Sequence, residues 1–152
     1  MKIDIKKLLF YIIVTIGIWS LPALFVDFDK YKEFIKPPLS PPGIVFPVVW
    51  TILFILMGIS IYRIVMTKDF GVDSLRILYF TQLFVNALWT PIFFGINAFL
   101  FAFIWLILLL ILVIIMTIKF HYLDKISAYL LIPYIIWLLF AGYLNLGVYI
   151  LN

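Results

Sequence analysis

The sequence predicts an all-α membrane protein, a bundle of five transmembrane helices. Hydrophobic residues make up 67% of the chain and charged residues 12%, against about 25% charged in a soluble domain. The 42 residues from Ile77 to Ile118 include no charged side chain. As a helix they would reach roughly 63 Å, about twice the ~30 Å hydrocarbon core of a bilayer, so they must cross it twice. Backbone groups in lipid must be satisfied internally, which makes these segments helices.

Uncharged segments place the five helices at about 6–26, 43–66, 75–94, 98–118 and 125–149, within a single domain of 152 residues. Each has close to the ~20 residues that a spanning helix needs. The first begins with lysines, like a signal peptide. Its apolar part is long for one, and Ser20-Leu21-Pro22-Ala23 is a poor cleavage site, so we expect a retained helix. The fold-back inside the long run is expected near Pro91, Gly95 and Asn97.

The Lys and Arg residues predict the orientation. With five spans, eight of them lie on the side of the N-terminus and three on the other. The positive-inside rule then places the N-terminus in the cytoplasm and the C-terminus outside. These residues flank apolar segments and form no patch, so nucleic acid is not expected as a partner despite the net charge of +4.

The outer segment 27–42 begins with charged residues and ends rich in proline, with Pro37, Pro38, Pro41 and Pro42. Proline fixes φ and restricts the residue before it, so a stiff, extended strap is expected. Two interpretations stay open: the strap is a rigid connector that starts the second helix, or it is a lid over the outer mouth of the bundle.

Ionisable side chains are missing from the central part of every span. Pumps, proton relays and ion channels usually place such groups inside the bundle, so ion-coupled transport is disfavoured. Ordinary acid–base catalysis has no candidate residues either. The chain has no cysteine, which excludes thiolate metal sites. No metal and no permanently bound cofactor are expected, and His121 is interpreted as a solvated loop residue.

Three spans carry aromatic, amide and small residues at helical spacing. The helical rise places all five tryptophans in the outer half of the membrane. Of these, Trp19, Trp89 and Trp105 could form an interfacial belt, with Asn86 and Asn145 bridging helices, whereas Trp137 lies near mid-bilayer and fits a belt poorly. Alternatively, they wall an apolar pocket that opens to the outside and suits a flat hydrophobic ligand. The stripes are Phe46, Trp50, Leu53 and Met57; Gln82, Asn86, Trp89 and Phe93; and Tyr134, Trp137, Ala141, Leu144 and Asn145.

At these residues the chain resembles the TspO/MBR family, also known as the translocator protein or peripheral-type benzodiazepine receptor. The resemblance covers roughly Lys36 to Asn152 in three ordered blocks. The blocks are Pro37, Pro41, Pro42, Phe46, Val49-Trp50 and Met57-Gly58; Gln82-Leu83, Asn86, Trp89 and Phe93-Phe94; and Ala128, Leu130-Leu131, Pro133-Tyr134, Trp137, Phe140-Ala141 and Leu144-Asn145.

The resemblance implies a five-helix bundle, usually a homodimer, in a membrane, here expected to be a bacterial cell membrane. It implies porphyrins (haem, protoporphyrin IX) and isoquinoline carboxamide or benzodiazepine compounds as ligands, and light- and oxygen-dependent breakdown of protoporphyrin IX. By this resemblance Trp50 and Trp137 carry the reaction. The implied ligand-binding residues are Pro41, Pro42, Phe46, Phe54, Asn86, Trp89, Tyr134, Ala141, Leu144 and Asn145.

One departure concerns sterols. The family's cholesterol motif needs a basic residue after a tyrosine near the end of the last helix, and only Ile150, Leu151 and Asn152 follow Tyr149. We therefore do not expect specific sterol binding. Ala98 and Ala102 are a weak sign of self-association.

Two other functions stay open. A porphyrin or lipid transporter is disfavoured by the odd number of spans and the absence of a visible internal repeat. A membrane receptor or scaffold without chemistry on its ligand would act through other membrane proteins, because the loops are short.

Overall fold

The protein is a bundle of long helices in a computed structural model that describes residues 2–152. The long helices are α1 (Ile5–Ala23), α2 (Val45–Met66), α3 (Val72–Thr90), α4 (Phe99–Leu123) and α6 (Ile132–Leu151), with short α5 (Lys125–Tyr129) and the helical turns η1 (Phe28–Glu33) and η2 (Pro91–Gly95). The described residues contain no strand. Five helical segments are long and apolar enough to cross a membrane, with α5 and α6 forming one of them. The predicted fold class is confirmed.

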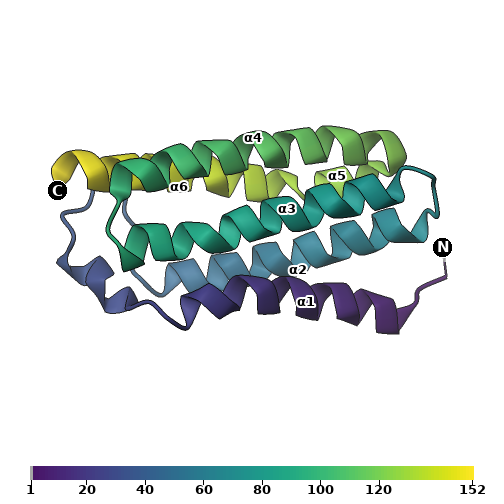
Figure 1. Ribbon diagram of the computed structural model, residues 1–152, viewed down its shortest axis with the longest axis horizontal. Coiled ribbons are helices and arrows are strands. Elements are labelled where there is room, and N and C mark those ends of the chain that lie inside the picture. Colours follow the sequence, from purple (N-terminus) through teal and green to yellow (C-terminus); the bar gives the residue numbers. More distant parts are fainter. Residues whose placement is uncertain (1) are drawn as a thin grey trace.

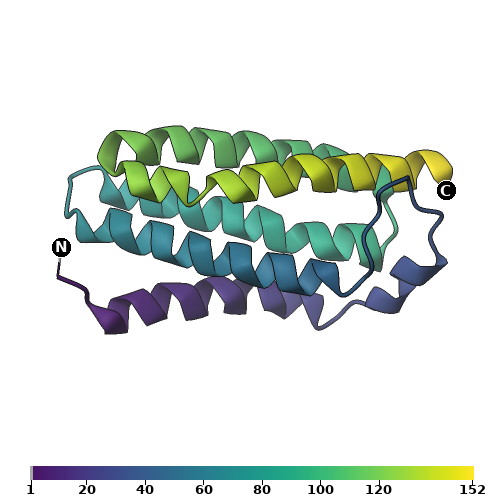
Figure 2. The same ribbon diagram turned by 180° about the vertical axis from the view of Figure 1, so that it is seen from behind.

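The helices form a ring with one loose seam. α1 packs against α2 and α3, α3 packs against α4, and α4 packs against α6. α2 approaches α5 closely, but α2 and α6 have almost no close backbone contact. Figure 2 shows α2 and α6 on the near side of the molecule with α3 visible between them. The α2–α6 seam is therefore closed at the α5 end and held elsewhere by side chains.

The structure divides the last span, expected as one helix over 125–149. α5 ends at Tyr129 and α6 begins at Ile132, with Pro133 in the first turn of α6. Proline is well placed there because the first N–H groups of a helix have no intrahelical partner. α4 continues past the expected end at 118, so that His121, expected in a loop, is an exposed residue of its last turn.

The fold-back between α3 and α4 lies where Pro91, Gly95 and Asn97 are. Pro91–Gly95 forms a single π-helical turn. Asn97 has φ 53°, in the left-handed region that asparagine tolerates better than most residues. This turn, the C-terminal end of α6 and the segment from Leu24 to Ile44 all lie at one end of the bundle (Figure 1).

The segment 24–44 crosses that end of the bundle, and α6 holds it there by three contacts. Tyr143 donates a hydrogen bond to the carbonyl of Pro38 at 2.6 Å. The side chain of Asn152 pairs with both the N–H and the C=O of Ile35, at 3.1 and 2.8 Å. The buried ring of Pro37 occupies the space that a Cβ on Gly147 would need.

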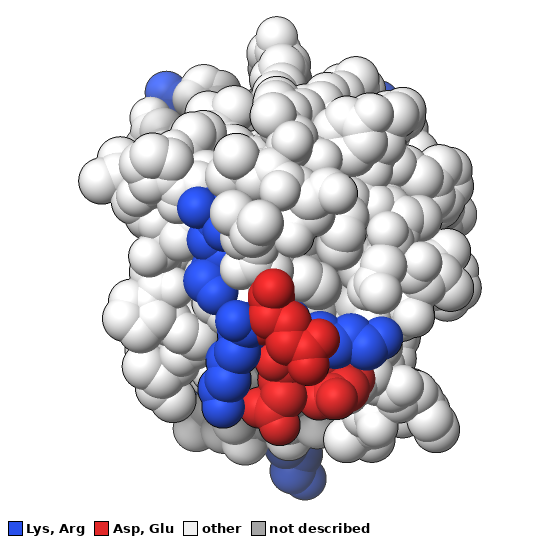
Figure 3. Space-filling model, turned by 90° about the vertical axis from the view of Figure 1, so that its left-hand side faces the viewer, with Lys and Arg blue, Asp and Glu red and all other residues white. Residues whose placement is uncertain are grey.

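η1 gives the first half of this segment a coiled rather than extended shape. Lys30 donates from Nζ to the carbonyl of Phe94 at 2.9 Å, which ties η1 to η2. Phe34 packs edge-on against Phe93 and Phe99, with ring centroids 5.7 and 5.0 Å away. Acidic and basic side chains gather in one patch on this end, and the surrounding surface is uncharged (Figure 3).

Substitution of Gly58 tests the close approach of α1 and α2. A Cβ at this position would lie 2.7 Å from the Cα of Ile12, a backbone atom that cannot move alone. We expect Gly58→Ala to destabilise the bundle by about 1–3 kcal/mol, as overpacking does. Gly17→Ala is the matched control, because nothing lies within 4 Å of its Cβ position. Thermal unfolding in detergent should show a lower Tm for Gly58→Ala alone; equal Tm values would contradict the packing.

Candidate functional site

Trp50 on α2 is the centre of an aromatic cluster that joins three helices. Its ring is stacked on Trp19 of α1 and on Phe54, with centroids 6.5 and 5.4 Å away. From α6, Tyr134 and Trp137 meet it edge to face at 6.2 and 6.3 Å. Such pairs contribute about 0.5–1.5 kcal/mol each beyond the area that they bury. The cluster therefore holds α2 to α6 where their backbones do not touch.

Phe46 extends this cluster towards the segment 24–44. Its ring lies edge to face with Trp137 at 6.0 Å and with Tyr31 at 5.1 Å. Tyr31 donates its hydroxyl to the carbonyl of Pro41 at 2.9 Å. Burial raises the pKa of the Tyr31 phenol above its ordinary value, so it stays protonated and remains a donor at neutral pH. The proline-rich half of the segment is thus fixed to the aromatic cluster.

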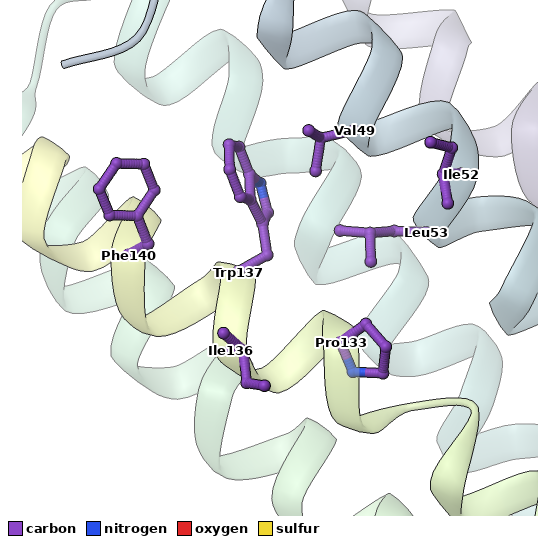
Figure 4. A pocket seen from close by; sticks show the side chains of 7 residues that line it. All are labelled: Val49, Ile52, Leu53, Pro133, Ile136, Trp137 and Phe140. Atoms are coloured by element: carbon purple, nitrogen blue, oxygen red, sulfur yellow. The ribbon is translucent and has the colours of Figure 1, made fainter. Parts of the chain in front are cut away.

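A hollow of about 500 Å³ lies in the seam between α2 and α6 (Figure 4), lined by Val49, Ile52, Leu53, Pro133, Ile136, Trp137 and Phe140. Every lining side chain is apolar or aromatic. Ile52 and Ile136 are 53% and 63% exposed, so the hollow opens at the side of the bundle. The sequence left open a pocket that opens to the outer face, whereas this hollow opens between α2 and α6. Phe54 and Tyr134 of the neighbouring aromatic cluster are fully buried.

Trp137 lines this hollow and carries a buried polar atom. Its indole stands between the two helices, with the nitrogen on the edge nearer α2 (Figure 4). The nitrogen is buried and has no hydrogen-bond partner among residues 2–152. A buried donor without a partner costs roughly 1–3 kcal/mol. A ligand that displaced a neighbouring side chain and presented an acceptor to this N–H would recover that free energy.

The amides have partners inside the protein. Asn86 donates to the hydroxyl of Tyr134 at 2.6 Å, and that hydroxyl donates to Gln82 at 2.9 Å, which joins α3 to α6. Trp89 donates to Asn145 at 3.0 Å, and Asn145 donates to the carbonyl of Phe99 at 2.9 Å. Of the two interpretations left open for the amides, the structure favours bridges between helices.

Four candidate ligand-binding residues belong neither to the aromatic cluster nor to the amide bridges. Leu144 is buried and Ala141 half-buried on α6, while Pro41 and Pro42 lie in the segment that leads into α2. None of these four residues lines the hollow.

Trp19 was missed as a member of the cluster, since it was considered only for an interfacial belt. It follows Tyr11 and Thr15, both buried, at a spacing of four residues. This spacing could have placed Trp19 on the inner face of α1.

An ion pair closes the α5 end of the seam. Arg63 of α2 donates from Nε and Nη2 to the two carboxylate oxygens of Asp124, at 2.7 and 3.1 Å. Asp124 also caps α5 by accepting from the backbone N–H of Ser127 at 3.1 Å. Ser60 of α2 donates to the carbonyl of Ser127 at 2.8 Å. Bidentate pairs of this kind fix geometry as well as adding free energy.

Titratable groups do not line the hollow. Within residues 2–152, no group of three His, Cys, Asp or Glu residues is placed to hold a metal ion. The arrangement suits binding of an apolar ring system.

The family model described as TspO/MBR family matches residues 9–151. The chain belongs to this family. It is 38% identical to "Protein CrtK" of Rhodobacter capsulatus over 86% of this chain and 82% of that protein. It is 36% identical to "Tryptophan-rich protein TspO" of Chlorobaculum tepidum, over 80% and 78%. The "Translocator protein" of Bos taurus is 34% identical over 78% and 72%.

Membership in the TspO/MBR family confirms the resemblance that was based on the three sequence blocks. Together with the five spans, it makes this chain an integral membrane protein. The pair of small residues Ala98 and Ala102, a weak sign of self-association in the sequence, has another explanation. Ala102 is fully buried against Phe93 and Val148 of the same chain.

Two Trp→Phe substitutions separate the unpaired indole from a paired one. Trp137→Phe removes an N–H that has no protein partner and keeps an aromatic ring against Trp50, so we expect the smaller change in Tm without ligand. Trp89→Phe removes the hydrogen bond to Asn145 and should cost about 1–3 kcal/mol, because it leaves a buried acceptor unpaired. Thermal unfolding of both variants in the same detergent measures this. An equal loss of stability would mean that the Trp137 N–H has a partner.

Stability should fall in acid through Asp124. Arg63 holds the pKa of this carboxyl below its ordinary value. The stabilisation is therefore fully present above the unfolded-state pKa of about 3.9 and is lost as pH falls through the lower folded-state pKa. We expect Tm to drop below about pH 4 in the parent protein and less steeply in Asp124→Asn, which lacks the titrating group. Parallel Tm–pH curves would contradict this role.

Proposed function

We propose that this protein binds a tetrapyrrole, such as protoporphyrin IX or haem, at the α2–α6 seam and promotes the light- and oxygen-dependent degradation of protoporphyrin IX. The observation that carries the proposal is the perpendicular pair of Trp50 and Trp137, 6.3 Å apart. The outer member of this pair has an unpartnered N–H beside an apolar hollow. Isoquinoline carboxamide and benzodiazepine compounds, also apolar ring systems, are expected at the same place.

The seam has the properties that a flat apolar ligand requires. Its volume of about 500 Å³ lies within the range of roughly 300–1,000 Å³ typical of ligand sites. Apolar walls supply affinity, and a single donor on Trp137 supplies orientation. The seam also lies beside lipid, into which the apolar macrocycle of a tetrapyrrole can partition. A ligand can therefore enter sideways without displacing the segment 24–44.

The reactive side chains are the indoles. A bound porphyrin supplies light absorption and the activation of oxygen, so the protein need not provide an acid or a base. Trp137 lines the hollow directly, and Trp50 lies behind it in contact with Trp19 and Phe54. Trp137 can donate an electron to an excited ligand, and Trp50 can share the resulting charge because the rings touch.

Trp137→Phe and Trp50→Phe test the proposal. In each variant the ring cluster keeps an aromatic side chain, so the bundle should fold. We expect the illuminated loss of protoporphyrin IX, measured by absorbance in air, to slow in both variants and most in the double variant. Trp105→Phe is the matched control, because Trp105 donates to Val85 on α3 and does not line the hollow. Equal rates for the double variant and the parent protein would contradict the assignment.

Binding is measured separately, by tryptophan-fluorescence titration with protoporphyrin IX in the dark. Dark affinity with no loss under illumination would favour a receptor or scaffold role. Porphyrin flux into sealed vesicles, without degradation, would favour transport. A relative from Cereibacter sphaeroides is named "Tryptophan-rich sensory protein", which makes a receptor role the alternative to test. The dark titration and the illuminated assay are therefore made on the same sample, so that binding and degradation can be compared directly.

A further inference from the structure

α3 has a second face that the α2–α6 seam does not use. A shallow groove of about 520 Å³ runs along this face, lined by Arg76, Ile77, Phe80, Thr81, Phe84 and Val85. It shares no residue with the hollow at Trp137. Ile77 and Phe84 are 68% and 60% exposed. The groove is thus an apolar stripe on the lipid-facing surface, with one cationic residue at the end that lies near the start of α3.

Arg76 is incompletely paired. Its Nη2 lies 3.4 Å from an oxygen of Asp73, whose side chain is 89% exposed. An exposed pair of this kind contributes little to stability, so it does not tie up the guanidinium. The Nε of Arg76 is buried and has no hydrogen-bond partner among the described residues. The side chain as a whole is 41% exposed, so its terminal N–H groups rather than the buried Nε can donate to an anion with several oxygens.

The dimensions of the groove match one leaflet. Arg76 and Val85 are nine residues apart on a continuous helix, which is about 13 Å at the helical rise. This is close to half of the ~30 Å hydrocarbon thickness. An ester-linked phosphate at Arg76 would lie at headgroup depth, and the acyl chain below it would reach the bilayer centre near Val85.

We propose that this groove is a binding site for an anionic phospholipid of the leaflet at the N-terminal end of the bundle. The phosphate accepts hydrogen bonds from Arg76, and an acyl chain lies along Ile77, Phe80 and Phe84. Net negative charge matters because a zwitterionic headgroup brings its own cation to the guanidinium.

Native mass spectrometry of the detergent-solubilised protein tests the site, with phosphatidylglycerol and phosphatidylcholine as probes. We expect phosphatidylglycerol to bind the parent protein more tightly than phosphatidylcholine. Arg76→Gln should weaken phosphatidylglycerol about tenfold, the loss expected for one charge-assisted hydrogen bond. Asp73→Asn should strengthen it, because the competing carboxylate is gone. Lys119→Gln is the control, since Lys119 is an exposed cation near the same end of the bundle.

Three results would overturn the proposal. Equal weakening by Arg76→Gln and Lys119→Gln would mean that only overall charge matters. Equal affinity for the two lipids would mean that the groove does not select anionic headgroups. Loss of a dimer in Phe84→Ala, with unchanged lipid binding, would mean that a second copy occupies the stripe. Arg76→Lys should keep most of the affinity, which separates loss of charge from misfolding.

Discussion

The aromatic contact between Trp50 and Trp137 determines how α2 and α6 are held together. The backbones of α2 and α6 have almost no close contact. The last span approaches α2 closely only through α5, which precedes α6. Along the rest of the seam, rings at centroid distances of 6.2 and 6.3 Å span the gap. Because large planar side chains keep the helices apart, space remains beside them on the lipid-facing side. The same contact therefore accounts for both the cohesion of the bundle and its hollow.

Two fixed points limit how far this seam can move. At one end, Arg63 and Asp124 join α2 to α5 by a bidentate ion pair. At the other end, the segment 24–44 is held to α6 by Tyr143 and Asn152 and to η2 by Lys30. Between these points the lining side chains are apolar and adaptable. Opening for a ligand would then require displacement of side chains such as Ile52 and Ile136 rather than rupture of polar contacts.

The spans were predictable because lipid excludes charge and unpaired backbone groups, so gaps between charged residues locate the helices. The division of the last span depends on local geometry around Leu130 and Leu131 that hydropathy does not register, although Pro133 marks the start of α6.

The meeting of Trp50 and Trp137 was anticipated from two separate stripes, because inner faces of neighbouring helices converge. The side on which the hollow opens was not predictable, since it depends on which pair of helices the rings hold apart. For a similar reason, the sequence could not determine whether Asn86 and Asn145 contact a ligand or bridge two helices. An amide facing the interior has the same spacing whether it orients a ligand or bonds to a neighbouring helix, as both do here.

The most direct test of a ligand site at the α2–α6 seam uses single cysteines, which the chain otherwise lacks. Ile136→Cys and Ile52→Cys place a thiol in the hollow, and Ile104→Cys places one on the exposed face of α4 at a similar exposure, away from both grooves. Labelling with a membrane-permeant maleimide is followed in the dark, with and without protoporphyrin IX. The account predicts that the porphyrin slows labelling at positions 136 and 52 but not at 104. Equal rates at all three positions, under conditions in which the porphyrin is bound, would contradict it.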